Sequence, residues 1–356
     1  MSLLINPFTP HLLSRLPKVP NKLLLLRASR IGDFVCATPA FRALRKAMPS
    51  AEITLMGMPF VEELVARSPH LDRFVPFPGF PGMAEQFFDA RRTVQFLQQM
   101  QVERFDLAIQ MHGSGVYSNP FTLMLGARVT VGFVREGDSP GCLDAALPMP
   151  INMHEVQRVL ALTTFLGASP QGEETEFPLW AEDIAAAQAL LASVQPPLIG
   201  LHPAAREATK RWASERFAIA GTVLRQQYGG TVVILGGLEE LPLTESIAPK
   251  IGPSCLNLAG KTSLAVLGGV ISQLSVLVTN DSGPAHIAYA LGIPTVTLFG
   301  GTDPTVWGPL RNDRHRVLVH NVPCRPCDYG VCPVGYTCLE NLTVEQVVES
   351  VAAVIR

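Results

Sequence analysis

Residues Ser275 to Phe299 read SVLVTNDSGPAHIAYALGIPTVTLF, and this stretch decides the fold class. Its two apolar ends, Ser275 to Thr279 and Thr295 to Phe299, have the length and the β-branched content of buried strands. Between them the loop NDSG leads into a helix from Pro284 to Leu291, and a proline suits a first helical turn, which needs no amide donor there. The stretch therefore predicts two parallel strands joined by a right-handed helical crossover.

The same order of elements occurs at the start of both halves of the chain. In the first half the run LLLL ends at Leu26, and the loop RASRIGD, a helix with Pro39 in its first turn and Pro49 after its end, and the run AEITLMG follow. In the second half LIGLHP precedes a helix from Ser214 to Tyr228 and the run TVVILGG. Residues 167–197 resemble a connection, because they contain SPQGEETE and a Pro-Pro pair. We therefore expect an α/β protein of two Rossmann-like domains, with ligands at the carboxyl ends of the strands.

The composition argues against two classes of protein. Lys and Arg number 28 against 30 Asp and Glu, and a formal net charge of −2 provides no basic field for nucleic acid. No apolar run approaches the roughly 18–20 residues of a membrane-spanning helix, and the first 21 residues lack the features of a signal peptide. We therefore expect a cytoplasmic protein, whose Leu12, Leu13 and Leu16 either cover the first domain or touch a membrane surface.

Three loops that follow strands concentrate polar residues. In the first, RASRIGD, Asp33 projects into the expected ligand crevice; alternatively, its carboxylate caps the next helix. The second, HPAAREATKRW, has three cations within six residues, which would neutralise a diphosphate or form a solvated basic loop. In the third, NDSG, Gly283 and the start of a helix favour an anion, against the simpler interpretation of a capped helix. These loops contain neither a dinucleotide fingerprint nor a P-loop.

Longer segments carry a resemblance to a known family. The segments KLLLLRASRIGDFVCATPAFRALRKAMPSAEI, IGLHPAAREATKRWASERFA and NLAGKTSLAVLGGVISQLSVLVTNDSGPAHIAYALGIPTVTLFGGTDPTVWGP are similar to glycosyltransferase family nine, the heptosyltransferases of lipopolysaccharide assembly. The resemblance implies the GT-B fold, in which two Rossmann-like domains turn their parallel sheets to a central cleft. We place the acceptor-binding domain at residues 1–175, the nucleotide-sugar domain at 176–342, and a helix returning towards the first domain at 343–356.

The resemblance also implies a reaction and its residues. The expected reaction is an inverting transfer of heptose, or a similar sugar, from an ADP-heptose-like donor to a lipopolysaccharide-core or other glycan or glycolipid acceptor, with peripheral contact to the inner membrane surface as an option. Asp33 matches the general base of the family. The donor-binding residues it implies are Ala204, Ala205, Lys210, Glu239, Lys261, Thr262, Asp281, Ser282, Gly283 and His286. The turn HPAA departs from the commoner HPG, so an alanine takes the place of the glycine there.

The expected chemistry needs no cofactor. Lys210 and the helix start at Ser282 and Gly283 would stabilise the departing diphosphate, and no loop has the paired carboxylates that would hold Mg²⁺ against it. Two other functions compete with a transferase. A GT-B epimerase of sugar nucleotides would need further acid and base residues in one cleft, which the sequence does not place. A non-catalytic glycan- or nucleotide-binding protein would not require Asp33, Lys210 and Asp281 together.

Four of the seven cysteines lie close together near the C-terminus. Cys324, Cys327, Cys332 and Cys338 have the spacing C-x2-C-x4-C-x5-C, which could wrap a tetrahedral zinc or iron. The alternatives are free thiols that pack the loop, and disulfides, which a reducing cytoplasm disfavours. In each case the expected role is structural, because the cluster follows the FGGTDP loop without supplying a base.

Overall fold

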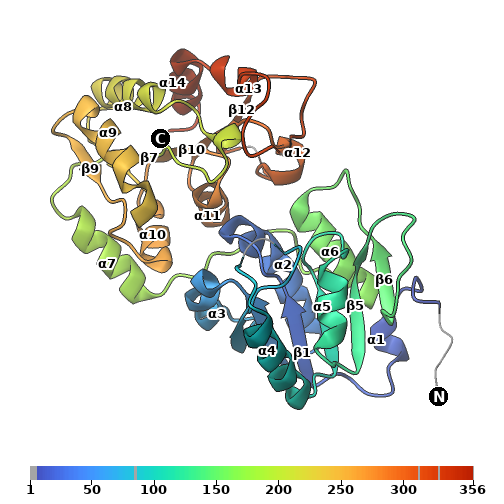
Figure 1. Cartoon of the computed structure of the whole chain (residues 1–356). Coiled ribbons are helices and arrows are strands. Elements are labelled where there is room, and N and C mark those ends of the chain that lie inside the picture. Colours follow the sequence, from blue (N-terminus) through green and yellow to red (C-terminus); the bar gives the residue numbers. More distant parts are fainter. Residues whose placement is uncertain (1–5, 84–85, 312, 328, 356) are drawn as a thin grey trace. The chain divides into compact units, whose positions relative to one another are not determined.

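The computed structural model describes residues 6–83, 86–311, 313–327 and 329–355. The chain divides into two compact units, Met1–Glu176 and Phe177–Arg356 (Figure 1). The division lies inside the predicted connection and next to the predicted boundary. Among the described helices, none has both the length and the apolar character that a membrane span requires.

The first unit is a parallel six-stranded sheet with helices on its faces (Figure 1). Its strands lie in the order β3-β2-β1-β4-β5-β6. They are β1 Lys22–Leu26, β2 Glu52–Gly57, β3 Arg73–Pro76, β4 Leu107–Gln110, β5 Val129–Val134 and β6 Ala145–Pro148. The helices are α1 Leu12–Arg15, α2 Ile31–Ala47, α3 Glu62–Arg67, α4 Ala90–Glu103, α5 Ser118–Met124 and α6 Glu155–Leu166, with a 3₁₀ turn, η1, at Pro59–Val61.

The second unit repeats this topology, because its parallel strands lie in the order β12-β11-β10-β7-β8-β9. They are β7 Leu198–His202, β8 Thr231–Ile234, β9 Cys255–Asn257, β10 Val276–Asn280, β11 Thr295–Phe299 and β12 His315–Val319. The helices are α7 Ala181–Leu191, α8 Ser214–Tyr228, α9 Leu241–Ile251, α10 Leu264–Ile271, α11 Gly283–Leu291, α12 Pro304–Trp307, α13 Thr337–Glu340 and α14 Val344–Ala352, with 3₁₀ turns η2 Ala208–Lys210 and η3 Leu238–Glu240. In each sheet the strand order reverses beside the first strand, between β1 and β4 and between β7 and β10. Such reversal points are where doubly wound sheets bind ligands.

Helix α2 begins earlier than the sequence predicted. The expectation put Pro39 in the first helical turn, whereas the helix starts at Ile31 and contains Pro39 in its interior. A proline there leaves the carbonyl of Val35 without its helical donor. The hydroxyl of Thr38 donates to that carbonyl at 2.8 Å, so the turn keeps its hydrogen bonding. As a consequence Asp33 lies in the first turn of α2 and not in a loop.

Helix α14 belongs to the core of the second unit. Val347 and Val351 are fully buried, and they pack with strand residues of the second sheet, among them Val278 and Leu298. The helix also packs along α8. The sequence placed residues 343–356 in a separate segment, whereas the structure includes them in the second unit. The return of this helix towards the first domain stays a prediction.

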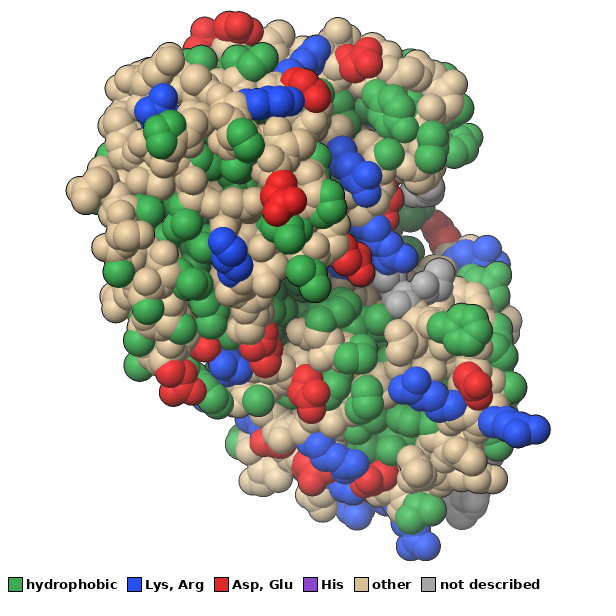
Figure 2. All heavy atoms as spheres, turned by 60° about the vertical axis from the view of Figure 1, so that its left-hand side comes forward, with side chains coloured by type: hydrophobic (Ala, Val, Ile, Leu, Met, Phe, Trp, Pro, Cys, Tyr) green, Lys and Arg blue, Asp and Glu red, His purple; other side chains and the backbone are tan. Residues whose placement is uncertain are grey.

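The surface contains charges of both signs. On the face drawn in Figure 2, Lys and Arg side chains alternate with Asp and Glu among apolar and uncharged residues. This mixture agrees with the formal net charge of −2. Long-range attraction of a polyanion requires a field of one sign, which this face does not present.

Candidate functional site

At the reversal point of the first sheet, the site is built around Asp33. One carboxylate oxygen, Oδ1, lies 3.1 Å from Nη2 of Arg27, and Oδ2 accepts a hydrogen bond of 3.3 Å from the backbone N–H of Arg30. The second contact closes the first turn of α2, so Asp33 does cap its helix, as the alternative interpretation held. Its side chain still keeps 22% of its surface exposed. The carboxylate therefore remains accessible to a second molecule.

Arg27 is buried, with 4% of its surface exposed, and it holds this site together. Besides Asp33, it donates to Oε1 of Glu155 at 2.6 Å and to the carbonyl of Met111, which follows β4. Arg158 binds the other oxygen of Glu155. Burial acts to lower the pKa of Arg27, but the carboxylates of Glu155 and Asp33 outweigh it and raise the pKa above its ordinary value. The buried cation is thus matched by two carboxylates.

Arg27 and Glu155 were not among the site residues predicted from the sequence. Arg27 had a detectable signal, because it is a charged residue directly after four buried leucines and opens the loop that contains Asp33. Glu155 had no such signal in the sequence. It lies 128 residues after Arg27, and the packing of α6 against α2 brings the two side chains together.

At the reversal point of the second sheet, Lys210, Asp281 and Thr302 meet. The ammonium of Lys210, at the end of η2, lies 3.0 Å from Oδ2 of Asp281, which directly follows β10. The hydroxyl of Thr302, beyond β11, donates to the same oxygen at 2.6 Å. Asp281 is only 4% exposed, whereas the side chain of Lys210 is 24% exposed. Residues of three separate loops are thus held around one carboxylate, with the cation facing outwards.

The start of α11 adjoins this cluster. Ser282 is the N-cap residue, and its hydroxyl lies 3.1 Å from Nδ1 of His202, the last residue of β7. Gly283 is the first helical residue and Pro284 the second. The first amides of a helix have no acceptor within it, and the helix dipole places positive potential there. The structure therefore brings together Lys210, Asp281, Ser282 and Gly283, and anion binding by this group stays a prediction.

The loop from Pro203 to Trp212 is fastened to β10 by Asn280. Its side-chain amide donates to the carbonyl of Pro203 at 2.8 Å, and its oxygen accepts from the backbone N–H of Trp212 at 3.1 Å. Ala204 and Ala205 lie inside this loop with 2% and 6% of their surface exposed. Their side chains therefore pack against the protein, and their contact with a donor stays a prediction.

Two neighbouring glutamates follow β8, and Glu240 is the one that contacts His202, whereas donor binding by Glu239 stays a prediction. Glu239 is exposed on η3. Glu240 accepts from the N–H of Gly237 at 2.8 Å and lies 3.5 Å from Nε2 of His202. Burial acts to raise the pKa of Glu240, but the hydrogen bond and charge of His202 and the N–H of Gly237 outweigh it and lower the pKa below its ordinary value. Both glutamates follow the same GG turn, so sequence position alone does not distinguish Glu239, the predicted residue, from Glu240.

The remaining donor-site predictions fall on neighbouring elements. Lys261 and Thr262 lie in the loop between β9 and α10, where the Lys261 ammonium donates to the carbonyl of Asn257 at 2.9 Å. His286 is buried in α11, and its ring packs edge-on against Tyr289 and Trp307, with ring centres 5.7 and 6.2 Å apart.

The four clustered cysteines differ in their surroundings. Cys324 is exposed, Cys327 and Cys332 are half-buried, and Cys338 is buried. Backbone N–H groups of residues 336, 334 and 335 donate to the Cys332 sulfur and lower the pKa of its thiol, and that of Tyr336 lies 3.2 Å away. Among the described residues, none of the cysteines forms a disulfide. Within the part of the chain that the structure describes, no three His, Cys, Asp or Glu side chains are grouped as metal ligands.

A comparison with family models places the chain in a known family. The model of glycosyltransferase family 9 (heptosyltransferase) matches residues 93–336. The chain belongs to glycosyltransferase family 9. The resemblance predicted from the sequence is thereby confirmed, and the chain is a glycosyltransferase.

Individual members of family 9 are similar over most of their length. Lipooligosaccharide heptosyltransferase 2 of Haemophilus ducreyi is 28% identical over 308 residues, which cover 81% of this chain and 86% of that protein. The crystal structure of a family 9 glycosyltransferase from Veillonella parvula superposes with a TM-score of 0.77 at 21% identity and covers 94% of this chain and 97% of that one. The structure of the E. coli ADP-heptose lipopolysaccharide heptosyltransferase II gives a TM-score of 0.74 at 22% identity, covering 94% and 98%. These likenesses confirm the GT-B fold class for this family 9 member.

Proposed function

We propose that this family 9 glycosyltransferase transfers heptose from an ADP-heptose donor to the core region of a lipopolysaccharide or lipooligosaccharide acceptor, with inversion at the anomeric carbon. The named relatives support the sugar, the nucleotide and the acceptor class. The observation that carries the proposal is the cluster of Lys210, Asp281 and Thr302 beside the start of α11, at the reversal point of the second sheet. A lysine ammonium beside the start of a helix favours an anionic group, and a departing nucleoside diphosphate is such a group.

On this proposal the second unit binds the donor. Lys210 contacts the diphosphate, and Asp281 holds the ammonium in place while its own charge stays enclosed by Lys210 and Thr302. The backbone N–H of Gly283, the first residue of α11, binds the same phosphates, since Pro284 has no N–H and that of Ala285 donates to the carbonyl of Ser282. Both groups stabilise the negative charge that grows on the leaving oxygen as the bond to the sugar breaks. The other donor contacts we propose are those predicted from the sequence, with Glu240 in place of Glu239.

The first unit then supplies the general base and binds the acceptor. An acceptor hydroxyl attacks the anomeric carbon and gives its proton to the carboxylate of Asp33. One C–O bond forms while the C–O bond to the diphosphate breaks, so ADP leaves and the sugar changes configuration. Arg27 positions the carboxylate through its contact with Oδ1. Since such an acceptor is anchored in a lipid, we further propose that the enzyme acts in the cytoplasm at the surface of the inner membrane.

The proposed chemistry uses no cofactor, because Lys210 and the helix start supply the positive charge at the leaving group. A structural zinc or iron at the cysteines is a separate question. Cys332 has the N–H donors that stabilise a thiolate, which fits a metal ligand. The described side chains do not, however, gather three ligands around one point. Elemental analysis of the purified protein decides between a bound metal and free thiols.

Calorimetry with ADP tests the donor site. Lys210→Ala should weaken ADP binding about ten- to a hundredfold, since a hydrogen bond to a charged group contributes about 1.5–3 kcal/mol. Lys250→Ala is the matched control, because Lys250 is an exposed lysine of the same unit whose ion pair with Glu215 spans 3.8 Å. If wild type fails to bind ADP, the nucleotide of the donor is not ADP. If wild type binds it but Lys210→Ala binds as tightly as Lys250→Ala, the donor site lies elsewhere.

A further inference from the structure

The loop that contains three of the four clustered cysteines is bound to the end of β11. We call the described residues 320–327 and 329–336, which follow β12, the cysteine loop. The guanidinium of Arg325 donates twice to the carbonyl of Gly300, at 2.7 Å from Nη2 and 3.0 Å from Nε. The backbone N–H of Cys327 donates to the next carbonyl, that of Gly301, at 2.8 Å. Two consecutive carbonyls after β11 are thus fixed by this loop.

The same two glycines contact the backbone next to Lys210. The N–H of Gly301 donates to the carbonyl of Thr209 at 3.2 Å. A Cβ atom at Gly300 would lie 2.2 Å from that carbonyl oxygen, so only glycine permits this approach. The hydroxyl of Thr209 in turn donates to the carbonyl of Tyr329 in the cysteine loop, at 2.8 Å. The position of Lys210, the next residue, therefore depends on how the glycine pair is held.

The glycine pair also leads directly to the buried carboxylate. Thr302 follows Gly301 in the chain and donates to Asp281, the ion-pair partner of Lys210. Both ends of the Lys210–Asp281 pair are hence connected to the segment Gly300–Thr302. Arg325 fixes this segment at the carbonyl of Gly300.

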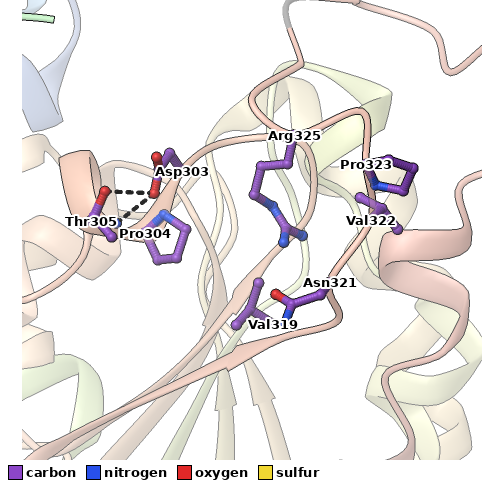
Figure 3. Close-up of a pocket in the computed structure, with 8 residues that line it drawn as sticks. All are labelled: Asp303, Pro304, Thr305, Val319, Asn321, Val322, Pro323 and Arg325. Carbon is purple, nitrogen blue, oxygen red and sulfur yellow. Dashed lines mark hydrogen bonds between the residues drawn. The ribbon is translucent and has the colours of Figure 1, made fainter. Parts of the chain in front are cut away.

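Arg325 lines an open pocket next to the Gly300 carbonyl to which it donates. Figure 3 shows its side chain extended towards the end of β12, between α12 and the cysteine loop, with Val319, Asn321 and Pro304 around it. The pocket has a volume of about 450 Å³. Arg325 lies outside the apolar core of this unit. Its side chain can therefore be shortened without opening a hole in that core.

We propose that Arg325 is a positioning residue of the donor site, which fixes the segment Gly300–Thr302 and through it Lys210 and Asp281. The proposal rests on the donor site proposed above and adds to it a residue that does not touch the diphosphate. The guanidinium acts by donating to a carbonyl. Its loss frees the carbonyl of Gly300, a residue with no side chain to restrain it, so only the bonds of Gly301 hold this segment. The Lys210 ammonium then spends less time in the position that binds phosphate.

The test is Arg325→Ala measured by ADP calorimetry and by steady-state kinetics. We expect the Kd for ADP and the KM for the sugar nucleotide to rise about tenfold, with a smaller change in kcat, because misplacing a binding group has effects of up to about a hundredfold. Arg325→Lys, which keeps a cationic donor, should recover part of the loss. Free guanidinium ion, far below denaturing concentrations, should enter the emptied pocket and restore ADP binding, whereas equal NaCl should not.

A matched control separates this role from general stability. Arg314 also donates from a guanidinium to a glycine carbonyl, that of Gly292 at 3.1 Å, but at the C-terminal end of α11. Arg314→Ala should bind ADP like wild type. If Arg325→Ala also binds like wild type while Lys210→Ala does not, the positioning role is wrong and the donor site stands. If guanidinium ion fails to restore binding to Arg325→Ala, the defect is not the lost hydrogen bond, and the proposal is equally overturned.

Discussion

Replacing Arg27 by methionine should destabilise the first unit strongly. Arg27 is 4% exposed and bonds the carboxylates of Glu155 and Asp33. The variant leaves the Glu155 carboxylate, itself 5% exposed, with one of its two arginine partners. Removing one member of a buried ion pair costs about 3–5 kcal/mol. For a unit of this size each kcal/mol lowers the melting temperature by about 2–4 °C, so we expect a decrease of about 6–20 °C.

A second substitution should reverse most of this loss. In Arg27→Met combined with Glu155→Leu, both charges are replaced by apolar groups, and such a replacement is often neutral or stabilising. Arg158 loses its carboxylate partner but still donates to the carbonyls of Pro150 and Met153, among others. The double variant should therefore melt closer to wild type than Arg27→Met does, although it should not regain transferase activity, because Asp33 has lost its partner.

Thermal unfolding followed by circular dichroism measures both effects. Arg135→Met serves as the control, because Arg135 forms an exposed ion pair with Asp138, and such pairs contribute about 0–1 kcal/mol. A melting temperature for Arg27→Met within about 2 °C of the control would show that the buried network is not the stabilising element described above.

Three further outcomes follow from the structure. Glu240→Gln should weaken ADP binding more than Glu239→Gln, because Glu240 contacts His202 at the end of β7. Equal losses of ADP affinity in calorimetry would contradict this preference for Glu240. Burial lowers the pKa of His315 to about 4, below its usual value of about 6.5, so stability should be complete above pH 6.5 and decrease as pH falls towards 4. His315→Gln should flatten that dependence in melts at pH 7 and pH 4.5, and an unchanged slope would contradict the assignment. Iodoacetamide should modify Cys332 before Cys255, whose pKa burial raises to about 11, and peptide mass spectrometry showing the reverse order would refute it.

The sequence predicts the central strands of both sheets and misses their edges. β1, β7, β10 and β11 are buried apolar runs, which the pattern of residues identifies directly. The strands that the sequence did not indicate are β3, β6, β9 and β12, which are the four edge strands. An edge strand pairs on one side only and is partly exposed, so its residues do not form a continuous apolar run.

At the site, local signals were sufficient for the loops but not for contacts between distant residues. Asp33, Lys210 and Asp281 were recognised because each lies in a polar segment of sequence shortly after a buried strand. Whether Asp33 caps α2 or faces a ligand could not be settled by sequence position, and the structure shows that it caps the helix while its side chain stays accessible. Glu240 was missed because the choice between adjacent glutamates depends on the packing of His202.

The central claim is that Asp33 accepts the proton of the acceptor hydroxyl during sugar transfer. The direct measurement is mass spectrometry of a heptose-deficient lipopolysaccharide core acceptor after incubation with ADP-heptose and either wild type or Asp33→Asn. Wild type should add one heptose and release ADP. Asp33→Asn should bind ADP with unchanged affinity and transfer about 10²–10⁴ times more slowly, the usual contribution of a general base. Transfer by Asp33→Asn at more than about a tenth of the wild-type rate would contradict the claim.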